Sequence, residues 1–373
     1  MIRLLLALLL LVLVAVRVPG EPRPDGTAEV MHLIAREIRA VLPGDAIGGA
    51  AAAVRIEGRT LFFNTGLADM ADRRPMTSDS LFNIASLRKL FEATLIAQAV
   101  QQGELALDDP VAKYVTELQQ GGTIRRVTIG QLATYTSGLL LRQDYEPWPD
   151  WGYTLPEFIA TLNAWEPERG HEGGQEHIYT HAGYVLLQLV LERRFSRPIG
   201  ELVTERLLEP LAMSSTVLPP RGANGRAELA PALMRRAVQG YDRDGAPIGA
   251  PGDQQGYYHF PGTGQMFSSV RDLATFLAAQ LGELPEHRSL QAAMALTQQR
   301  VARYAPRHWQ ALAWEVNDNT DPPIVEKIAG LNNTSGHMGM IRDKRIGIVI
   351  LSNRGSQYMA TAGRRVLAEL AHP

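Results

Sequence analysis

The sequence predicts an α/β fold of the α+β type, in which helices flank an antiparallel sheet and a mostly helical domain is inserted between the first and last strands. Two observations predict it: strand patterns are confined to the two ends of the chain, and the stretch between them is mostly helical. Strands from both ends that meet in space form one sheet with helices on its faces. We expect residues 28–80 and 281–373 to form the sheet domain and residues 81–280 the helical domain.

Composition narrows the class of protein. The 373 residues are 45% hydrophobic and 20% charged, which is typical of a globular chain that is long enough for a large core. The formal net charge of -2 and the lack of a basic stripe argue against a nucleic-acid partner. The chain has no cysteine, so it forms no disulfide and offers no thiolate nucleophile.

The first 20 residues are predicted to be a signal peptide or an N-terminal anchor. Arg3 precedes an unbroken apolar run over residues 4–16, and Pro19 and Gly20 follow it. A basic start, a short apolar core and a polar exit are typical of a secretory signal, and the run is shorter than the ~20 residues that a membrane-spanning helix needs. We therefore expect a periplasmic or secreted protein that contacts a membrane only if this segment stays uncleaved. We also expect a monomer.

The first elements of the sheet domain are a helix and a hairpin. Residues 28–41 carry apolar side chains at helical spacing and are followed by Pro-Gly, which ends the helix. Residues 48–56 and 60–63 are predicted strands, and the turn that joins them contains Gly58.

The predicted helical domain opens with a helix that begins at Ser86 and is closed by Gly103. Thr128 followed three residues later by Gln131 is typical of a capping box and predicts a second helix start. Residues 240–264 are rich in Gly, Pro, Asp and Tyr, so we expect a long surface loop there.

Strand patterns return in the last quarter of the chain. They cover residues 311–316, 326–329, 336–341 and 347–351. A final helix is predicted over residues 360–370. These strands and the N-terminal hairpin are the ones that we expect to share a sheet.

A serine and a lysine three residues apart stand at the start of the first helix of the helical domain. Positions three apart share a helix face, so the Lys89 side chain can lie beside the Ser86 hydroxyl. An alcohol becomes a nucleophile when a base takes its proton and N–H groups stabilise the oxyanion, and a helix N-terminus offers such N–H groups. The structural alternative is that Ser86 caps the helix and Lys89 is solvated.

Several motifs in chain order resemble those of class C β-lactamases, within the penicillin-recognising serine hydrolase family. They cover residues 82–89, 103–110, 132–139, 312–315 and 347–353. The resemblance implies an antiparallel sheet with an inserted helical domain, hydrolysis through an acyl-enzyme on Ser86, and no cofactor.

The second motif of that family, Tyr-x-Asn, is similar to the segment from Tyr179 to His181. By resemblance, Tyr179 acts as general base toward Ser86 and then as general acid toward the leaving group, because a phenol near two lysines has a lowered pKa. His181 stands where the family has an asparagine that orients the lysine and touches the substrate's amide, and histidine is larger and titrates near neutral pH. Gln143 falls near a substrate-contacting glutamine of the family.

The third motif, Lys-Thr-Gly, is matched only in part. The family's spacing back from Asn353 reaches Lys327, which is followed by Ile328, Ala329 and Gly330. The lysine is kept, but Ile328 replaces the hydroxyl that would bind a substrate carboxylate, and Ala329 replaces the glycine that permits close backbone approach. By resemblance, Gly330 and the nucleophilic serine supply the two oxyanion N–H groups. We expect the loss of this hydroxyl to cost ~1–3 kcal/mol of interaction free energy with the substrate carboxylate.

Two alternatives concern this third motif. His337, Met338 and Gly339 resemble the His-x-Gly variant of the motif, but they lie only 16 residues before Asn353 instead of 26, so a structural histidine is the better interpretation. Lys327 can also be a simple charge on an edge strand.

A cluster of histidines and glutamates raises the question of a metal site. His177 and His181 are four residues apart, and His171, Glu172 and Glu176 are close in sequence. The segment is rich in glycine and lacks the H-E-x-x-H pattern of a helical zinc site. We therefore expect solvated loop histidines and no metal.

Aromatic residues also cluster between the helix start predicted at Thr128 and the motif that begins at Tyr179. Tyr145, Trp148 and Trp151 alternate with prolines. We expect them to pack the rim of a loop, with a hydrophobic substrate groove as the alternative.

Two functions from different classes remain. The first is a secreted serine hydrolase that acts through an acyl-enzyme on a β-lactam, a D-alanyl peptide or a small ester, so that its partner is a small-molecule or peptide substrate. The changes at His181, Ile328 and Ala329 argue against efficient hydrolysis of ordinary penicillins. The second is a non-catalytic binding or regulatory protein on the same scaffold, because fold by itself implies no function.

Overall fold

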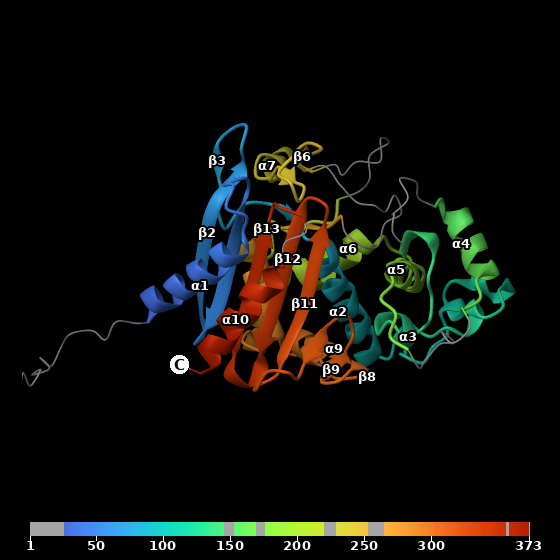
Figure 1. The fold of residues 1–373 in the computed structure, drawn as a ribbon. Coiled ribbons are helices and arrows are strands. Elements are labelled where there is room, and N and C mark those ends of the chain that lie inside the picture. Colours follow the sequence, from blue (N-terminus) through green and yellow to red (C-terminus); the bar gives the residue numbers. More distant parts are fainter. Residues whose placement is uncertain are drawn as a thin grey trace, which may run out of the picture.

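The strands form one large antiparallel sheet in the computed structural model, which describes residues 26–144, 153–168, 176–219, 229–252, 265–355 and 358–372 (Figure 1). Within these residues the sheet has nine strands. In spatial order they are β3 (Arg74–Pro75), β2 (Arg59–Asp69), β1 (Gly49–Ile56), β13 (Ile346–Ser352), β12 (Thr334–Ile341), β11 (Ile324–Leu331), β10 (Glu315–Asn317), β9 (His308–Gln310) and β8 (Ala302–Ala305). Two short pairs lie apart from it: β4 (Phe82–Asn83) with β7 (Phe267–Ser268), and β5 (Gly240–Tyr241) with β6 (Pro247–Ile248). The predicted antiparallel sheet flanked by helices is confirmed.

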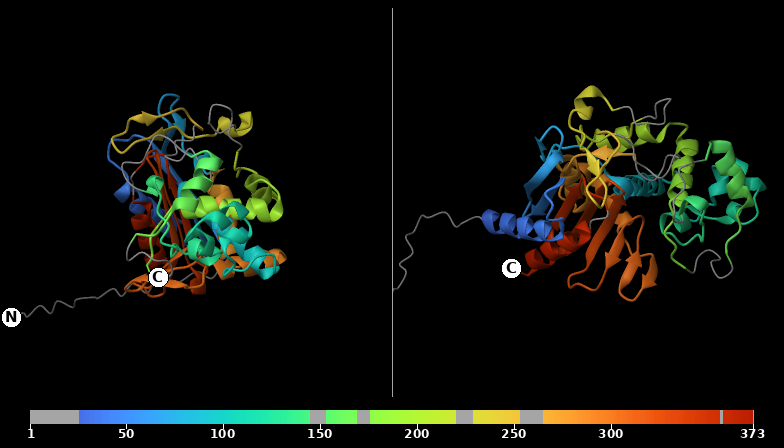
Figure 2. Two further views of the ribbon diagram at one scale, coloured as in Figure 1. Left: turned by 90° about the vertical axis from the view of Figure 1, so that its right-hand side faces the viewer. Right: turned by 45° about the horizontal axis from the view of Figure 1, so that its top comes forward.

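Helices cover both faces of this sheet. The α-helices of the described residues are α1 (Thr27–Val41), α2 (Arg88–Gln101), α3 (Ile129–Ala133), α4 (Leu155–Ala164), α5 (Ala182–Phe195), α6 (Ile199–Val203), α7 (Pro231–Met234), α8 (Val270–Gln280), α9 (Arg288–Thr297) and α10 (Met359–Ala371). Helices α1 and α10 pack together on one face, whereas α8 packs on β1 and β13 from the other. Figure 2 shows α3, α4 and α5 gathered beside the sheet, away from α1 and α10. No helix in the described ranges is long and apolar enough to cross a bilayer.

Strand β1 shows how the sheet is buried on both faces. Ala50, Ala52 and Val54 belong to the core beneath α1 and α10, whereas Ala51 and Ala53 belong to the core on the α8 side. Successive side chains of a strand point to opposite faces, so alternate residues of β1 pack against the helices on each face of the sheet. The short alanine side chains leave room for helices to approach from both sides.

The N-terminal predictions are confirmed by α1 and by the β1–β2 pair. Ile56 lies opposite Arg59, so the turn consists of Glu57 and Gly58, with φ of 51° and 71°. Positive φ at both central residues is what a tight hairpin turn of this hand requires, and glycine adopts it without strain. Strand β2 continues to Asp69, which is further than the sequence predicted.

The helix ends predicted in the middle of the chain are also confirmed. Gly103 follows α2 with a φ of 69°, and its N–H donates to Val100 O. The capping box at the start of α3 is complete, since Thr128 and Gln131 each bond the other's backbone. The final helix predicted over residues 360–370 is α10.

One predicted strand, over residues 311–316, is wrong in its first four residues. Strand β10 begins only at Glu315, and before it Ala313 has a φ of 62° while the Ala311 N–H donates to Trp314 O. Leu312 and Trp314 are buried in this turn. Their apolar spacing resembled a strand, but it reflects burial of a turn from several sides.

The loop predicted over residues 240–264 is partly wrong. Its first part contains the hairpin of β5 and β6, in which Gly240 pairs with Ile248. Residues 253–264 lie outside the described part of the chain. The buried Arg354 side chain donates to the carbonyl groups of Asp242 and Arg243, so this hairpin is fastened to the end of β13.

The division into a sheet domain and a helical domain stays a prediction. Helix α8 falls within the predicted helical range, 81–280, yet it packs on strands β1 and β13. Other helices of that range, such as α2 and α5, contact each other and contribute to the large core.

A buried charged cluster fastens α10 to strand β11. The Arg364 guanidinium donates to both carboxylate oxygens of Glu326, and His337 Nε2 lies 3.0 Å from the same carboxylate. Burial opposes ionisation of Glu326, but His337 and Arg364 outweigh it and lower the pKa of this carboxyl to about 2. A Cβ atom placed on Gly363 would lie 2.1 Å from His337 Nδ1. Helix α10 therefore approaches the sheet only because position 363 has no side chain.

Gly363→Ala should lower the free energy of unfolding by about 1–3 kcal/mol, because the added methyl group overlaps a buried imidazole. The loss is expected although alanine is the better helix former by about 1 kcal/mol. Urea unfolding measures it. Gly44→Ala is the control, since Gly44 is exposed and an added Cβ meets nothing within 4 Å. Equal stability of the two variants would contradict the packing argument.

Candidate active site

Ser86 lies in a short, strained turn between β4 and α2. The turn is a 3-10 segment, Ala85–Leu87, and Ala85 has a φ of 48°. The Asn83 side chain accepts a hydrogen bond from the Ala85 N–H at 3.1 Å and so supports this conformation. A non-glycine residue with positive φ costs free energy and is often found where a turn must present a functional side chain. The structural alternative for Ser86 is wrong, because its hydroxyl does not cap the helix.

The hydroxyl of Ser86, the amine of Lys89 and the phenol of Tyr179 form a triangle. Ser86 Oγ lies 2.9 Å from Tyr179 Oη, and Lys89 Nζ donates to Ser86 Oγ at 3.2 Å and to Tyr179 Oη at 2.9 Å. Lys89 is fully buried, so the prediction of a solvated lysine is wrong. Burial lowers the pKa of Lys89. The three groups can therefore exchange a proton over single hydrogen bonds.

Tyr179 lies between two lysines. Lys89 Nζ and Lys327 Nζ each lie 5.0 Å from the centroid of its ring. Burial of the phenol opposes its ionisation, but the two positive charges outweigh this effect and lower its pKa from 10.0 to about 8. The ring also packs at 4.7 Å on Tyr135, which is buried beneath it. A substantial fraction of Tyr179 is thus the phenolate at mildly alkaline pH.

Lys327 comes from the middle of β11, and its side chain is buried. Lys327 Nζ forms an ion pair with Glu315 Oε1 at 3.2 Å. Among the described residues, β10 pairs with β11 only over Ile324, Val325 and Glu326, so the stretch of β11 that begins at Lys327 has a strand on one side only. Lys327 is therefore not a simple charge on an edge strand, because its side chain is buried and ion-paired, although the strand does present an edge there.

The end of β11 packs directly against the Ser86 turn. Ile328 is 37% exposed, Ala329 is buried, and Gly330 is exposed. A Cβ atom on Gly330 would make only an ordinary contact, 3.8 Å from Thr334 O. The structure thus brings this strand to the serine, with an aliphatic side chain where the resembling family has a hydroxyl.

His181 lies beside Lys89 and Tyr179. Its Nδ1 atom lies 3.5 Å from Lys89 Nζ, and its ring meets the Tyr179 ring edge to face. Burial, together with the charges of Lys89 and Lys327, holds the pKa of His181 well below its usual range. The imidazole is therefore neutral, and a neutral ring has one acceptor nitrogen that can orient the lysine.

Asp144 is a residue of this site that the sequence reasoning missed. Its Oδ1 accepts a hydrogen bond from the His181 N–H, and its Oδ2 accepts one from the Thr180 hydroxyl and one from the Leu141 N–H. The carboxylate also lies at the first turn of α5, where unpaired N–H groups favour a negative charge. Asp144 thus fixes the segment that carries Tyr179. The signal available was an acidic residue next to the predicted Gln143, but only tertiary contact reveals its partners.

The remaining predicted residues are placed as follows. The side chain of Gln143 lies outside the described part of the structure, as do Tyr145, Trp148 and Trp151. His337 points to the α10 face of the sheet, where it contacts Glu326, so it does not reach the serine.

The histidines considered as metal ligands have other contacts. His177 Nε2 lies 2.9 Å from Gln310 Oε1, and its ring stacks on Tyr304 at 4.4 Å. Among the described residues no three His, Asp or Glu side chains are grouped so that they could hold a metal ion. His171 and Glu172 lie outside these residues.

Comparison with known proteins gives consistent similarities. A model of the Beta-lactamase family matches residues 34–371. The beta-lactamase of Escherichia coli strain K12 is 25% identical over 362 residues, which cover 87% of this chain and 89% of that protein. A class C beta-lactamase structure from Rhodobacter sphaeroides has a TM-score of 0.78 at 25% identity and covers 91% of this chain and 99% of its own. A beta-lactamase/D-alanine carboxypeptidase structure from Pseudomonas syringae has the same TM-score, 0.78, and the same identity, 25%. The match covers 92% of this chain and 100% of the P. syringae chain.

Of the 11 tyrosines in the chain, Tyr179 should titrate near pH 8. A spectrophotometric titration of tyrosinate absorbance in the native protein measures this. We call the rise in absorbance caused by ionisation of Tyr179 the tyrosinate step. Lys89→Met should move the tyrosinate step to higher pH, because one of the two charges that favour the phenolate is removed. Tyr179→Phe should abolish the step, and a step that persists in this variant would assign it to another tyrosine.

Proposed function

The chain belongs to the beta-lactamase family and is a serine hydrolase, and from this premise we propose that it works through an acyl-enzyme formed on Ser86. The observation that carries the proposal is the triangle of Ser86, Lys89 and Tyr179. A nucleophile within hydrogen-bond distance of a base, which is in turn oriented by a third group, is the arrangement that acyl transfer needs. The same observation favours an enzyme over a non-catalytic binding protein.

In the proposed acylation, the Ser86 oxygen attacks the substrate carbonyl while its proton passes to Tyr179 or Lys89. The bond to the leaving group breaks, and that proton moves to the leaving group. A water molecule then attacks the ester carbon, the acid product leaves, and Ser86 regains a proton. The backbone N–H groups of Ser86 and Gly330 are proposed to bind the oxyanion, since β11 packs against the serine turn.

Lys327 and His181 are proposed to assist without bonding the substrate's reacting carbon. The charge of Lys327 favours the phenolate of Tyr179. Neutral His181 orients Lys89 in the place of the family's asparagine. No metal or cofactor takes part in the proposed reaction.

For the substrate, we propose a small ester or an unusual amide before an ordinary penicillin. The similar P. syringae structure is named a beta-lactamase/D-alanine carboxypeptidase, so we include β-lactams and D-alanyl peptides in the test. Ile328 offers no hydroxyl to a substrate carboxylate, and His181 fills the space of a smaller amide side chain. An ester without a carboxylate needs neither contact.

We also propose that residues 1–20 direct export, which would place the mature protein in the periplasm or outside the cell. The support is the basic start and short apolar run at the N-terminus.

Ser86→Ala should abolish turnover of a short-chain nitrophenyl ester and of a chromogenic cephalosporin, with a loss of at least about a thousandfold. The wild type should form a covalent adduct on Ser86 with a fluorophosphonate, seen by mass spectrometry, and the variant should not. Equal turnover by both proteins would remove Ser86 as the nucleophile. An unlabelled but folded wild type would favour the binding protein.

Ile328→Thr should raise kcat/KM for the cephalosporin by about tenfold to a hundredfold, because it restores a hydroxyl for the substrate carboxylate. The nitrophenyl ester, which has no carboxylate, should show no such gain. Ile328→Val is the matched control, since it is branched at the same carbon and has no hydroxyl. An equal gain with valine would show that size, and not hydrogen bonding, limits the cephalosporin.

A further inference from the structure

A chain of buried polar side chains joins α2 to α5, the two helices that flank the triangle. Arg88 donates through Nε to Glu92 Oε1 at 2.8 Å and through Nη2 to Gln188 Oε1 at 2.6 Å. Gln188 then donates to Glu192 Oε1 at 3.0 Å, and the same oxygen accepts the Ile199 N–H at 3.0 Å. The chain thus runs from the helix that carries Lys89, through α5, to the start of α6.

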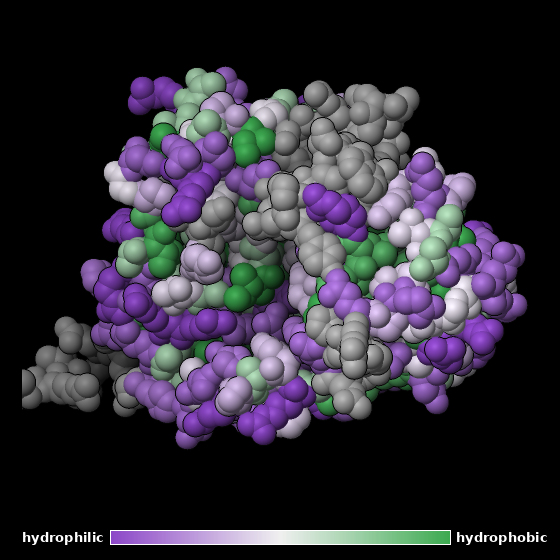
Figure 3. All heavy atoms as spheres, turned by 45° about the vertical axis from the view of Figure 1, so that its right-hand side comes forward, coloured by the Kyte–Doolittle hydropathy of each residue, from purple (hydrophilic) through white to green (hydrophobic). Residues whose placement is uncertain are grey.

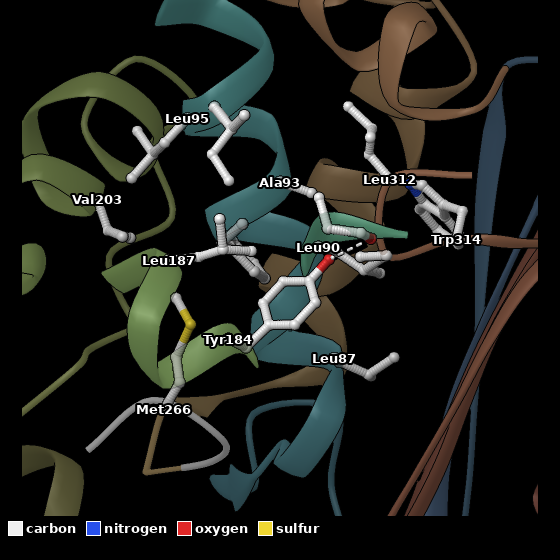
Figure 4. Close-up of a cluster of buried hydrophobic side chains, with 14 of the residues drawn as sticks. Leu87, Leu90, Ala93, Leu95, Tyr184, Leu187, Val203, Met266, Leu312 and Trp314 are labelled. Atoms are coloured by element: carbon white, nitrogen blue, oxygen red, sulfur yellow. Dashed lines mark hydrogen bonds between the residues drawn. The ribbon is translucent and has the colours of Figure 1, made fainter. Parts of the chain in front are cut away.

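The surroundings of this polar chain are apolar. Figure 4 shows Leu90 of α2 close to Tyr184 and Leu187 of α5, within the large hydrophobic core. Arg88 and Glu92 have side chains that are 1% and 0% exposed. Apolar contacts of this kind are non-directional, so they hold two helices together without fixing the rotation of one against the other.

The ion pair of Arg88 and Glu92 adds little to stability. Removing two charges from water costs several kcal/mol per ion, and replacement of a buried pair by apolar residues of similar volume is often neutral or stabilising. Glu92 Oε2 has no hydrogen-bond partner among the described residues, which leaves part of that cost uncompensated. A feature with little benefit to stability is better explained by the geometry that it imposes.

The geometry of α2 matters because the reacting groups lie at its start. Ser86 precedes the helix by two residues and Lys89 is its second residue, whereas α5 begins three residues after Tyr179. Side-chain tips lie about 5–6 Å from a helix axis, so a rotation of about 10° moves them by roughly 1 Å. A displacement of about 1 Å can cost about a hundredfold in rate.

We propose that Arg88, through its directional bonds to Glu92 and Gln188, is a positioning residue that fixes the rotation of α2 against α5 and thereby holds Ser86 and Lys89 against Tyr179. The planar guanidinium suits this task because its donors have a fixed geometry. The inference rests on the proposed function for its kinetic consequence, but its geometric consequence is independent of any substrate.

The test is the double variant Arg88→Met/Glu92→Leu, which removes both charges together. We expect its melting temperature to equal or exceed that of the wild type, while kcat for the nitrophenyl ester falls about tenfold to a hundredfold with little change in KM. In the same variant, the tyrosinate step of Tyr179 should move above the wild-type value near pH 8. A purely structural role would instead link any loss of activity to a loss of stability.

Two further variants complete the test. Gln188→Met removes the link between the helices but keeps the ion pair. It should lower kcat and move the tyrosinate step to higher pH, as in the double variant. If the double variant does not fold, the result for Gln188→Met decides the inference. Thr94→Val is the control on the same helix, since among the described residues the buried Thr94 hydroxyl bonds to Leu90 O within α2 alone, and it should change neither value.

Unchanged kcat and an unchanged tyrosinate step in the folded double variant and in Gln188→Met would overturn the inference. If the wild type shows no adduct on Ser86, the proposed function fails, and the position of the tyrosinate step in the variants still decides whether Arg88 sets the geometry.

Discussion

The contact of the Lys89 amine with the Ser86 hydroxyl and the Tyr179 phenol is the interaction on which the rest of this site depends. Lys89 is buried, so its charge is favoured only by what surrounds it, and the phenol is its main partner. The same proximity lowers the pKa of Tyr179. Burial therefore lowers the pKa of the Lys89 amine, and the two neighbouring lysine charges lower the pKa of the Tyr179 phenol.

The fold produces this contact from segments that are far apart in the chain. Ser86 and Tyr179 are separated by 93 residues, and Lys327 comes from a strand of the C-terminal part. The antiparallel sheet places β11 against the serine turn, while the bonds of Asp144 to Thr180 and His181 fix the tyrosine segment. Figure 3 shows a hollow on this face, with both hydrophilic and hydrophobic residues of the described chain beside it.

The groups around the triangle differ from the family pattern in a consistent direction. By resemblance, His181, Ile328 and Ala329 are the positions that differ on the proposed substrate side, whereas the serine, the first lysine and the tyrosine keep their identity. Ser86, Lys89 and Tyr179 are mutually hydrogen-bonded, and Ser86 and Lys89 are buried, whereas Tyr179 and Ile328 are each 37% exposed. Exposed positions can change without disturbing the buried ones.

The sequence by itself determined most periodic elements and the relation of Ser86 to Lys89, which depends on local spacing. Alternation and helical periodicity predicted α1, the β1–β2 hairpin and α10, and a separation of three residues placed Lys89 beside Ser86. Tyr179 and Lys327 were identified only by resemblance, and Asp144 and the Arg88 network not at all. Tertiary structure decided these, because the partner of a buried polar group is set by which distant segments pack together, and the buried turn at Leu312 and Trp314 shows that an apolar pattern does not reveal which surfaces cover it.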